Sequence, residues 1–193
     1  MIKKIAILLL LIPTTIFAAP GLYIQAEGGL ITSTGLDDDP FLDINIDPTA
    51  RLSLGYLLGD CNFNFGLEAG GTYYRASDQS TTFLGQKEDV TVDGSVFDLL
   101  AVAKYTFNSG FNVFAKAGGA YITRNINRTI TSSGIAYPYN GNSSVAAPEL
   151  AVGLGYQLTP HWGISLTGNA LFNAPAPMNH MADAMIGVSY RFG

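Results

Sequence analysis

Cysteine is nearly absent from this chain of 193 residues, in which Cys61 is the only one. A single cysteine excludes an intramolecular disulfide, so no covalent cross-link stabilises the fold. Long apolar runs are also lacking after the first 20 residues, although 48% of the residues are apolar. A transmembrane helix needs about 20 consecutive, mostly apolar residues. The sequence therefore excludes helical membrane spans beyond the N-terminus.

The N-terminus has the three parts of a secretory signal peptide. Lys3 and Lys4 form a short basic region, residues 5–12 are apolar, and Ala18 and Ala19 supply small residues for cleavage. The apolar run is too short to cross a membrane as a helix, and no cysteine follows it for lipid attachment. We therefore expect residues 1–19 to be a signal peptide and residues 20–193 to form one exported domain.

Basic residues are scarce in the exported part. The whole chain carries 10 basic and 15 acidic residues, and loss of Lys3 and Lys4 leaves a formal net charge of −7. Nucleic acid is excluded as a partner, because phosphate binding requires a basic face. An exported, apolar chain without membrane helices has one main way to enter a membrane, which is as a closed β-barrel.

Alternation of apolar and polar residues supports this interpretation. In residues 162–172 one alternate set runs from Trp162 through Ile164 and Leu166 to Phe172, whereas the other set is small and mostly polar. A period of two is typical of a strand with two different faces. The pattern recurs in eight segments long enough to cross a bilayer as tilted strands, which are residues 22–30, 50–58, 63–73, 97–107, 111–121, 149–158, 162–172 and 183–192.

The connections alternate between short and long. Turn residues occupy 59–61, 108–110 and 159–161, and polar stretches occupy 32–49, 76–95, 125–147 and 173–182. Aromatic residues gather at both ends of the segments on the apolar set, as in the two girdles of membrane barrels. The sequence predicts an all-β fold, an eight-stranded antiparallel up-and-down transmembrane β-barrel, with short turns in the periplasm and the polar stretches outside the cell.

Charged residues inside the segments all fall on the polar set. Lys104 and Lys116 stand out because each interrupts an apolar run, and the alternation points both into the barrel. We expect an interior charge network with a structural role, made of Glu27, Arg51, Glu68, Asp98, Lys104, Lys116, Glu149 and Arg191, with Asp183 near the outer rim. Eight strands enclose a lumen that side chains can fill. A polar plug is the preferred interpretation, and a gated or proton-conducting lumen is the alternative.

These segments resemble the eight-stranded outer-membrane barrels of the OmpA/OmpX type over residues 20–193. The last strand ends in Tyr190-Arg191-Phe192-Gly193 and resembles the terminal assembly signal of that family, with Tyr190 and Phe192 as its aromatic residues. The resemblance implies a monomer in the outer membrane, contact with lipid and lipopolysaccharide, and insertion by the barrel-assembly machinery. The chain stops after the barrel, so we expect no peptidoglycan-binding domain.

Candidate catalytic and metal sites are weak. His161 falls in a predicted turn, at the wrong end for the active site of an outer-membrane lipid A deacylase. His180 falls in the fourth polar stretch, three residues before Asp183, without a nucleophile pattern. Asp37, Asp39 and Asp43 lack the glycine and glutamate spacing of a calcium loop. We expect no enzyme, no cofactor and no metal, and we take Arg124 and Arg128 as solvated loop residues that could alternatively contact phosphate groups.

The function that the sequence predicts is therefore architectural. We expect an integral outer-membrane barrel with a closed or nearly closed lumen and with surface loops available for adhesion or host contact. The alternatives are a narrow pore for small solutes, a lipid-modifying outer-membrane enzyme, and a secreted lipocalin-like binder. The last would require the apolar set to face inward.

Overall fold

The computed structural model describes residues 21–35, 46–59, 62–83, 86–132, 135–172 and 178–192. The expected signal peptide, residues 1–19, lies outside the described residues. So does the acidic stretch that carries Asp37, Asp39 and Asp43. No helix in the described ranges is long and apolar enough to cross a membrane.

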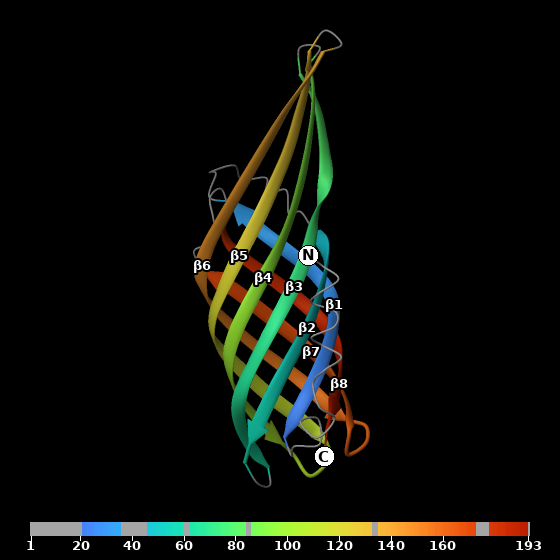
Figure 1. Ribbon diagram of the computed structural model, residues 1–193. Helices are drawn as coiled ribbons and strands as arrows, with labels where there is room; N and C mark the ends of the chain where they lie inside the picture. The colour runs from blue at the N-terminus through green and yellow to red at the C-terminus, as the bar shows by residue number, and fades with distance from the viewer. Residues whose placement is uncertain are drawn as a thin grey trace, which may run out of the picture.

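Eight strands form a closed antiparallel barrel (Figure 1). Each strand pairs with the next along the chain, and β1 also pairs with β8, so every strand has two neighbours within the barrel. This confirms the predicted fold. The strands are β1 (Leu22–Gly35), β2 (Ile46–Leu58), β3 (Phe63–Phe83), β4 (Gln86–Thr106), β5 (Phe111–Ser132), β6 (Ile135–Gln157), β7 (Trp162–Phe172) and β8 (Met178–Arg191).

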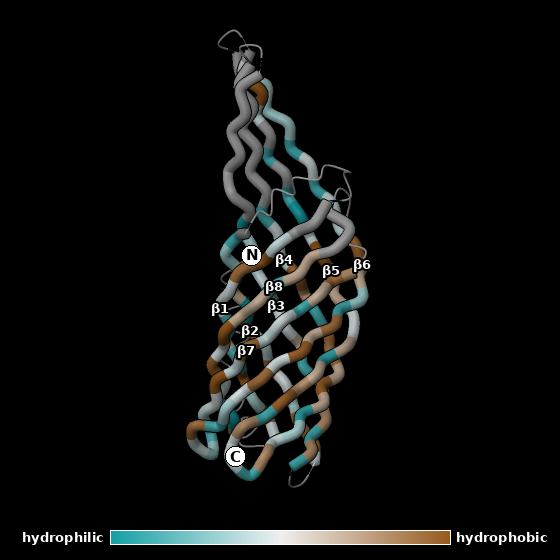
Figure 2. The backbone as a smooth tube through the Cα atoms, turned by 180° about the vertical axis from the view of Figure 1, so that it is seen from behind, coloured by the Kyte–Doolittle hydropathy of each residue, from teal (hydrophilic) through white to brown (hydrophobic). Residues whose placement is uncertain are grey.

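Hydrophobic and hydrophilic residues follow one another along the strands of the barrel wall (Figure 2), and burial assigns them to different faces. On β2, Leu52 and Leu54 are 58% and 47% exposed on the outer surface, whereas Arg51 and Ser53, on the alternate set, are buried. The outer surface consists largely of leucine, isoleucine, valine and aromatic side chains. In water this apolar surface would remain exposed to solvent, whereas in a bilayer the lipid tails cover it. The alternation therefore matches a barrel with hydrocarbon outside and polar groups inside.

Tight turns close one end of the barrel, which we call the turn end. Residues 108–110 connect β4 to β5, and Gly110 has a φ of +85°, a conformation that side chains other than glycine rarely adopt. In the turn from β6 to β7, the Thr159 hydroxyl accepts a hydrogen bond from the Trp162 N–H at 2.9 Å. Both turns occupy positions where the sequence predicted them.

Aromatic side chains surround the turn end. The Trp162 and Tyr190 rings lie edge to face at a centroid distance of 4.9 Å, and Tyr190 makes the same kind of contact with Phe192. Tyr105 and Phe107, which are two positions apart in the sequence, also pack edge to face. Edge-to-face packing suits the quadrupoles of these rings. The exposed rings form the girdle that the sequence predicted at this end.

The opposite end, which we call the hairpin end, departs from the prediction. Residues 76–95 and 125–147 were expected to be loops, yet the described parts of both ranges, 76–83, 86–95, 125–132 and 135–147, continue as strands. β3, β4, β5 and β6 therefore rise together beyond β1, β2, β7 and β8 (Figure 1). Residues 137–140 of β6 are exposed on both faces of the strand, so no apolar alternation marks this part of the extension in the sequence. We call residues 75–83, 86–95, 123–132 and 135–148 the protruding sheet.

Candidate functional site

An ionic layer fills the middle of the barrel, and Arg51 on β2 lies at its centre. Its guanidinium contacts three carboxylates, each from a different strand. The distances are 2.6 Å to Asp98, 3.0 Å to Glu68 and 3.7 Å to Glu27. All four side chains are almost completely buried. Glu27, Arg51 and Glu68 lie on the consecutive strands β1, β2 and β3, which brings their side chains together inside the barrel.

Glu68 on β3 receives more donors than any other carboxylate in the ionic layer. The Lys116 ammonium on β5 lies 2.7 Å and 2.9 Å from its two oxygens, and Arg51 donates to the first of them. The Tyr23 hydroxyl on β1 donates to the second at 2.5 Å. Glu68 has no exposed surface. A carboxylate this deeply buried requires such partners, since desolvation would otherwise strongly disfavour its charge.

Polar side chains complete the ionic layer on the far wall. Glu27 accepts hydrogen bonds from the Thr167 hydroxyl at 2.7 Å and from the Gln25 amide at 3.0 Å. Glycines leave room for the large charged groups. A Cβ atom at Gly70 would lie 2.3 Å from the Arg51 guanidinium, and one at Gly187 would lie 2.7 Å from the Glu27 side chain. Substitution of either glycine would force these charged side chains to move.

Sequence reasoning missed Tyr23. Tyr23 lies on the inward-facing alternate set of β1. An aromatic residue on that set was the feature of the sequence that could have identified it as part of the interior. Asp183 is also buried, and it accepts a hydrogen bond from the Asn169 amide at 2.5 Å. Both residues therefore extend the polar interior beyond the ion pairs.

Three of the eight expected network residues do not join the ion pairs. Glu149 is buried, but among the described residues its Oε2 atom has no hydrogen-bond partner. Lys104 and Arg191 instead line a cavity of about 270 Å³ at the turn end. The charges are therefore unevenly distributed, because the six buried acids, which include Asp47 on β2, lie deeper than Lys104 and Arg191, in or above the ionic layer.

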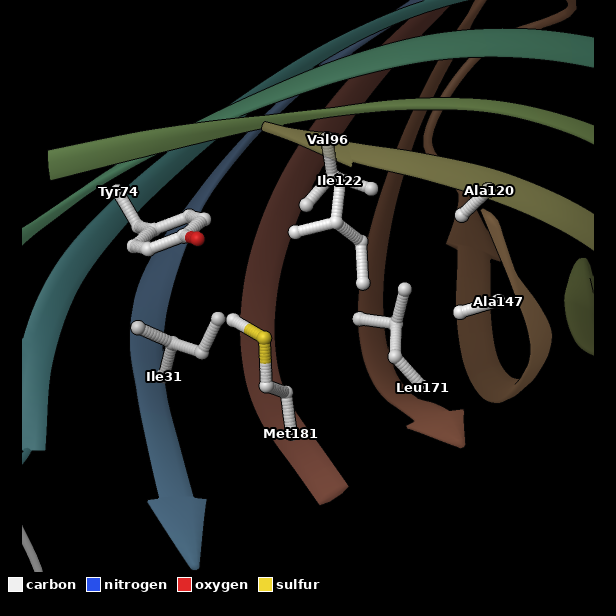
Figure 3. Close-up of a cluster of buried hydrophobic side chains, with 8 residues drawn as sticks. All are labelled: Ile31, Tyr74, Val96, Ala120, Ile122, Ala147, Leu171 and Met181. Atoms are coloured by element: carbon white, nitrogen blue, oxygen red, sulfur yellow. The ribbon is translucent and has the colours of Figure 1, made fainter. Parts of the chain in front are cut away.

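An apolar cluster lies above the ionic layer, toward the hairpin end. Figure 3 shows its side chains pointing toward one another across the lumen. Every strand except β2 contributes to it, and its members are Ile31, Tyr74, Val96, Ala120, Ile122, Ala147, Leu171 and Met181. The sequence interpretation, which assumed a polar interior throughout, missed this cluster. The interior of the barrel thus has a cationic cavity, an ionic layer and an apolar cluster in series.

His161 takes part in no catalytic arrangement with the described side chains. His161 is exposed in its turn, and its Nδ1 atom lies 3.1 Å from the Arg191 carbonyl oxygen. His180 was expected in a loop, but its backbone belongs to β8 and pairs with Phe172 on β7. Asp183 faces Asn169 inside the barrel. No group of three or more histidine, cysteine or acidic side chains in the described ranges could hold a metal ion.

A family model decides the class of this barrel. The model of the outer membrane protein beta-barrel domain matches residues 5–192. The chain belongs to this family. Its localisation is therefore the outer membrane of a Gram-negative bacterium, and its outer apolar surface faces lipid. Short turns of such barrels lie in the periplasm, so the turn end faces the periplasm and the protruding sheet faces outward.

Solved structures share the same architecture at low sequence identity. Ail, the attachment invasion locus protein of Yersinia pestis, is 15% identical, with a TM-score of 0.59 over 90% of this chain and 100% of that one. Neisserial surface protein A is 15% identical, with a TM-score of 0.54 over 89% and 97%. The outer membrane enzyme PagL is 13% identical, with a TM-score of 0.50 over 88% and 99%. No curated protein matches the chain significantly. These similarities establish the fold, and the neighbours include both enzymes and proteins of other kinds.

Proposed function

We propose that this protein is a non-enzymatic, non-conducting barrel that presents the protruding sheet for contact with other surfaces. The observation that carries this proposal is the extension of four strands beyond the rest of the barrel. A barrel that served only as a membrane plug would not require it. The proposal has two parts, a binding surface outside the membrane and a sealed lumen within it.

Exposed aromatic rings on the protruding sheet support the binding surface. Tyr137 and Tyr139 are 57% and 65% exposed. They lie on the face of β6 that continues the barrel interior, because the register from Glu149 upward has no shift. Among the described residues no strand closes the barrel at this height, so the rings are exposed rather than packed in a core. Tyrosine rings in such positions are common anchors in protein interfaces.

The edge of β6 is a second feature suited to contact. β7 pairs with β6 only up to Glu149, so residues 135–148 have a strand neighbour on one side alone. Pro138 and Pro148 lie in this edge segment, and proline is a usual means of preventing uncontrolled pairing of edge strands. The remaining backbone groups of the edge can accept a strand or loop from a partner protein.

The layered interior supports a sealed lumen. The apolar cluster closes the hairpin end of the lumen with buried side chains, and the ionic layer occupies the middle with fixed pairs. Ions crossing this path would have to break buried charge pairs and enter an apolar constriction, and each step costs several kcal/mol. A narrow pore remains the rival function. It predicts conductance in planar bilayers that changes when Glu68 or Lys116 is neutralised.

Adherence assays test the binding surface. Bacteria that express the protein should adhere to cultured cells or matrix proteins more than vector controls do. The double variant Tyr137→Ser with Tyr139→Ser should lose most of that adherence, because it removes both rings without altering the barrel. The matched control, Asn140→Ser with Asn142→Ser, changes exposed residues on the opposite face of the same strand and should adhere like wild type. Equal adherence of both double variants, or none by wild type, would refute the proposal.

Ail supplies one defined partner class for the same assay. A structure of Ail, 14% identical with a TM-score of 0.55, contains the heparin analogue sucrose octasulfate. Binding of the present protein to immobilised heparin is therefore measured in a separate experiment. The net charge of −7 expected after signal cleavage opposes a polyanion, so we expect little binding in this arm.

A further inference from the structure

The cavity at the turn end has an unbalanced charge. Lys104, Lys116 and Arg191 line it, and no carboxylate is found among the described residues of its wall. Lys116 is already paired with Glu68. Lys104 and Arg191 form no ion pair with any described residue, so two cations face one enclosed space without a counter-charge.

The fold keeps the interior acids away from this cavity. Glu68 is fully buried beneath Lys116 and Tyr23, and Asp98 is held by Arg51 at 2.6 Å. Glu68 cannot turn toward Lys104 without leaving the buried Lys116 ammonium unpaired, and Asp98 cannot do so without giving up its contact with Arg51. Like charges that share a poorly solvated space repel each other. No carboxylate of the described residues is therefore placed to neutralise Lys104 and Arg191, and a mobile anion is a group that can do so.

Neutral hydrogen-bonding groups surround the two cations. Amide side chains of Asn64, Asn112 and Gln157 line the cavity together with the Ser189 hydroxyl. Amide N–H and hydroxyl groups bond well to oxyanions, and a guanidinium can bind two oxygens of one phosphate. A volume of about 270 Å³ is roughly nine times the share of one water in the liquid. The cavity is large enough for a phosphate group with a small organic substituent.

We propose that the turn-end cavity is a binding site for a small oxyanion of the phosphate class, reached from the periplasm. Arg191 binds two of its oxygens, and Lys104 supplies a second positive charge. The ligand is either a soluble periplasmic phosphate compound or the phosphate of a lipid headgroup in the inner leaflet. This inference is independent of the adhesive role, which concerns the other end of the molecule.

Titration with inorganic phosphate tests the site. The full chain is refolded in octyl glucoside micelles in Tris chloride buffer, because neither the detergent nor the buffer contains an oxyanion. Phosphate binding is then measured by calorimetry. Saturable binding at one site is expected. Lys104→Gln and Arg191→Gln should each weaken it at least about tenfold, equivalent to about 1.4 kcal/mol, and the double variant should abolish it.

Two further variants keep the test decisive. Arg75→Gln removes an equal charge from an exposed position at the hairpin end and should bind phosphate like wild type. Lys104→Arg preserves the charge in the cavity and should retain binding even if a glutamine variant folds poorly. Folding of each variant is checked by its heat-modifiable mobility on gels. Absence of saturable binding by wild type, or undiminished binding by the folded double variant, would overturn the proposal.

A vesicle arm identifies the source of the ligand. The same titration is repeated after refolding into phosphatidylcholine vesicles. A weaker apparent affinity than in octyl glucoside would mean that headgroup phosphates compete for the cavity, which supports the site with lipid as its ligand. An unchanged affinity would support the site with a soluble ligand.

Discussion

Replacing Glu68 with glutamine perturbs the ionic layer most directly. The substitution preserves the shape of the side chain but removes the charge that Lys116 contacts at 2.7 Å and 2.9 Å. Arg51 keeps Asp98 at 2.6 Å and Glu27 at 3.7 Å, so it stays compensated. Lys116 keeps no carboxylate partner among the described residues and is only 4% exposed. Breaking a buried pair in this way costs about 3 to 5 kcal/mol.

The partner variant should behave differently. In Lys116→Met, Glu68 retains Arg51 and the Tyr23 hydroxyl, so we expect a loss of only about 1 to 3 kcal/mol. The double variant Glu68→Gln with Lys116→Met leaves no unpaired ammonium. It should therefore be more stable than Glu68→Gln alone by at least about 2 kcal/mol.

Urea unfolding in phospholipid vesicles measures these differences. Trp162 is the only tryptophan and lies in the girdle at the turn end, so its fluorescence reports loss of the barrel. Arg75→Gln is the control and should change the free energy of unfolding by less than about 0.5 kcal/mol. The account of the ionic layer is wrong if Glu68→Gln unfolds within 1 kcal/mol of wild type, or if the two substitutions are additive.

Three further predictions concern the surface, the lumen and assembly. Leu150→Arg should destabilise the barrel by about 2 to 4 kcal/mol in vesicles, whereas Leu158→Arg beside a turn should cost about 0 to 1 kcal/mol; equal losses would contradict the inferred membrane position. Wild-type protein should be silent in planar bilayers, and steady conductance would contradict the sealed lumen. The pair Tyr190→Ala with Phe192→Ala should lower the yield of folded barrel in outer-membrane fractions without preventing refolding in detergent, and normal yields would refute their role as an assembly signal.

The outer surface of the barrel could be predicted because lipid imposes a strict rule. Hydrocarbon tolerates no charge, so Leu52, Leu54 and Ile164 fall on one alternate set and Arg51 falls on the other. The contacts inside the barrel were harder to predict. Arg51 and Glu68 come from neighbouring strands, but Lys116 reaches Glu68 from β5, across β4. That contact depends on strand tilt, which the sequence does not reveal.

The apolar cluster and the protruding sheet escaped prediction for a related reason. Tyr73 and Phe97 face outward, whereas their neighbours Tyr74 and Val96 face inward. Both faces are apolar at this height, so the alternation vanishes. Along residues 137–140 of the protruding sheet both faces of β6 are exposed, and the alternation vanishes again. A period of two is informative only where the two sides of a strand meet different environments.

Nitroxide scanning along β6 tests the central claim most directly. With Cys61 replaced by serine, single labels are placed at each position from 149 to 154, and their collisions with oxygen and with a water-soluble nickel complex are measured. The account predicts that labels at Leu150, Val152 and Leu154 collide mainly with oxygen dissolved in lipid, and that labels at Glu149, Ala151 and Gly153 are shielded from it. Equal oxygen accessibility at both sets, or lipid contact at the second set, would contradict a barrel with hydrocarbon outside and charges inside.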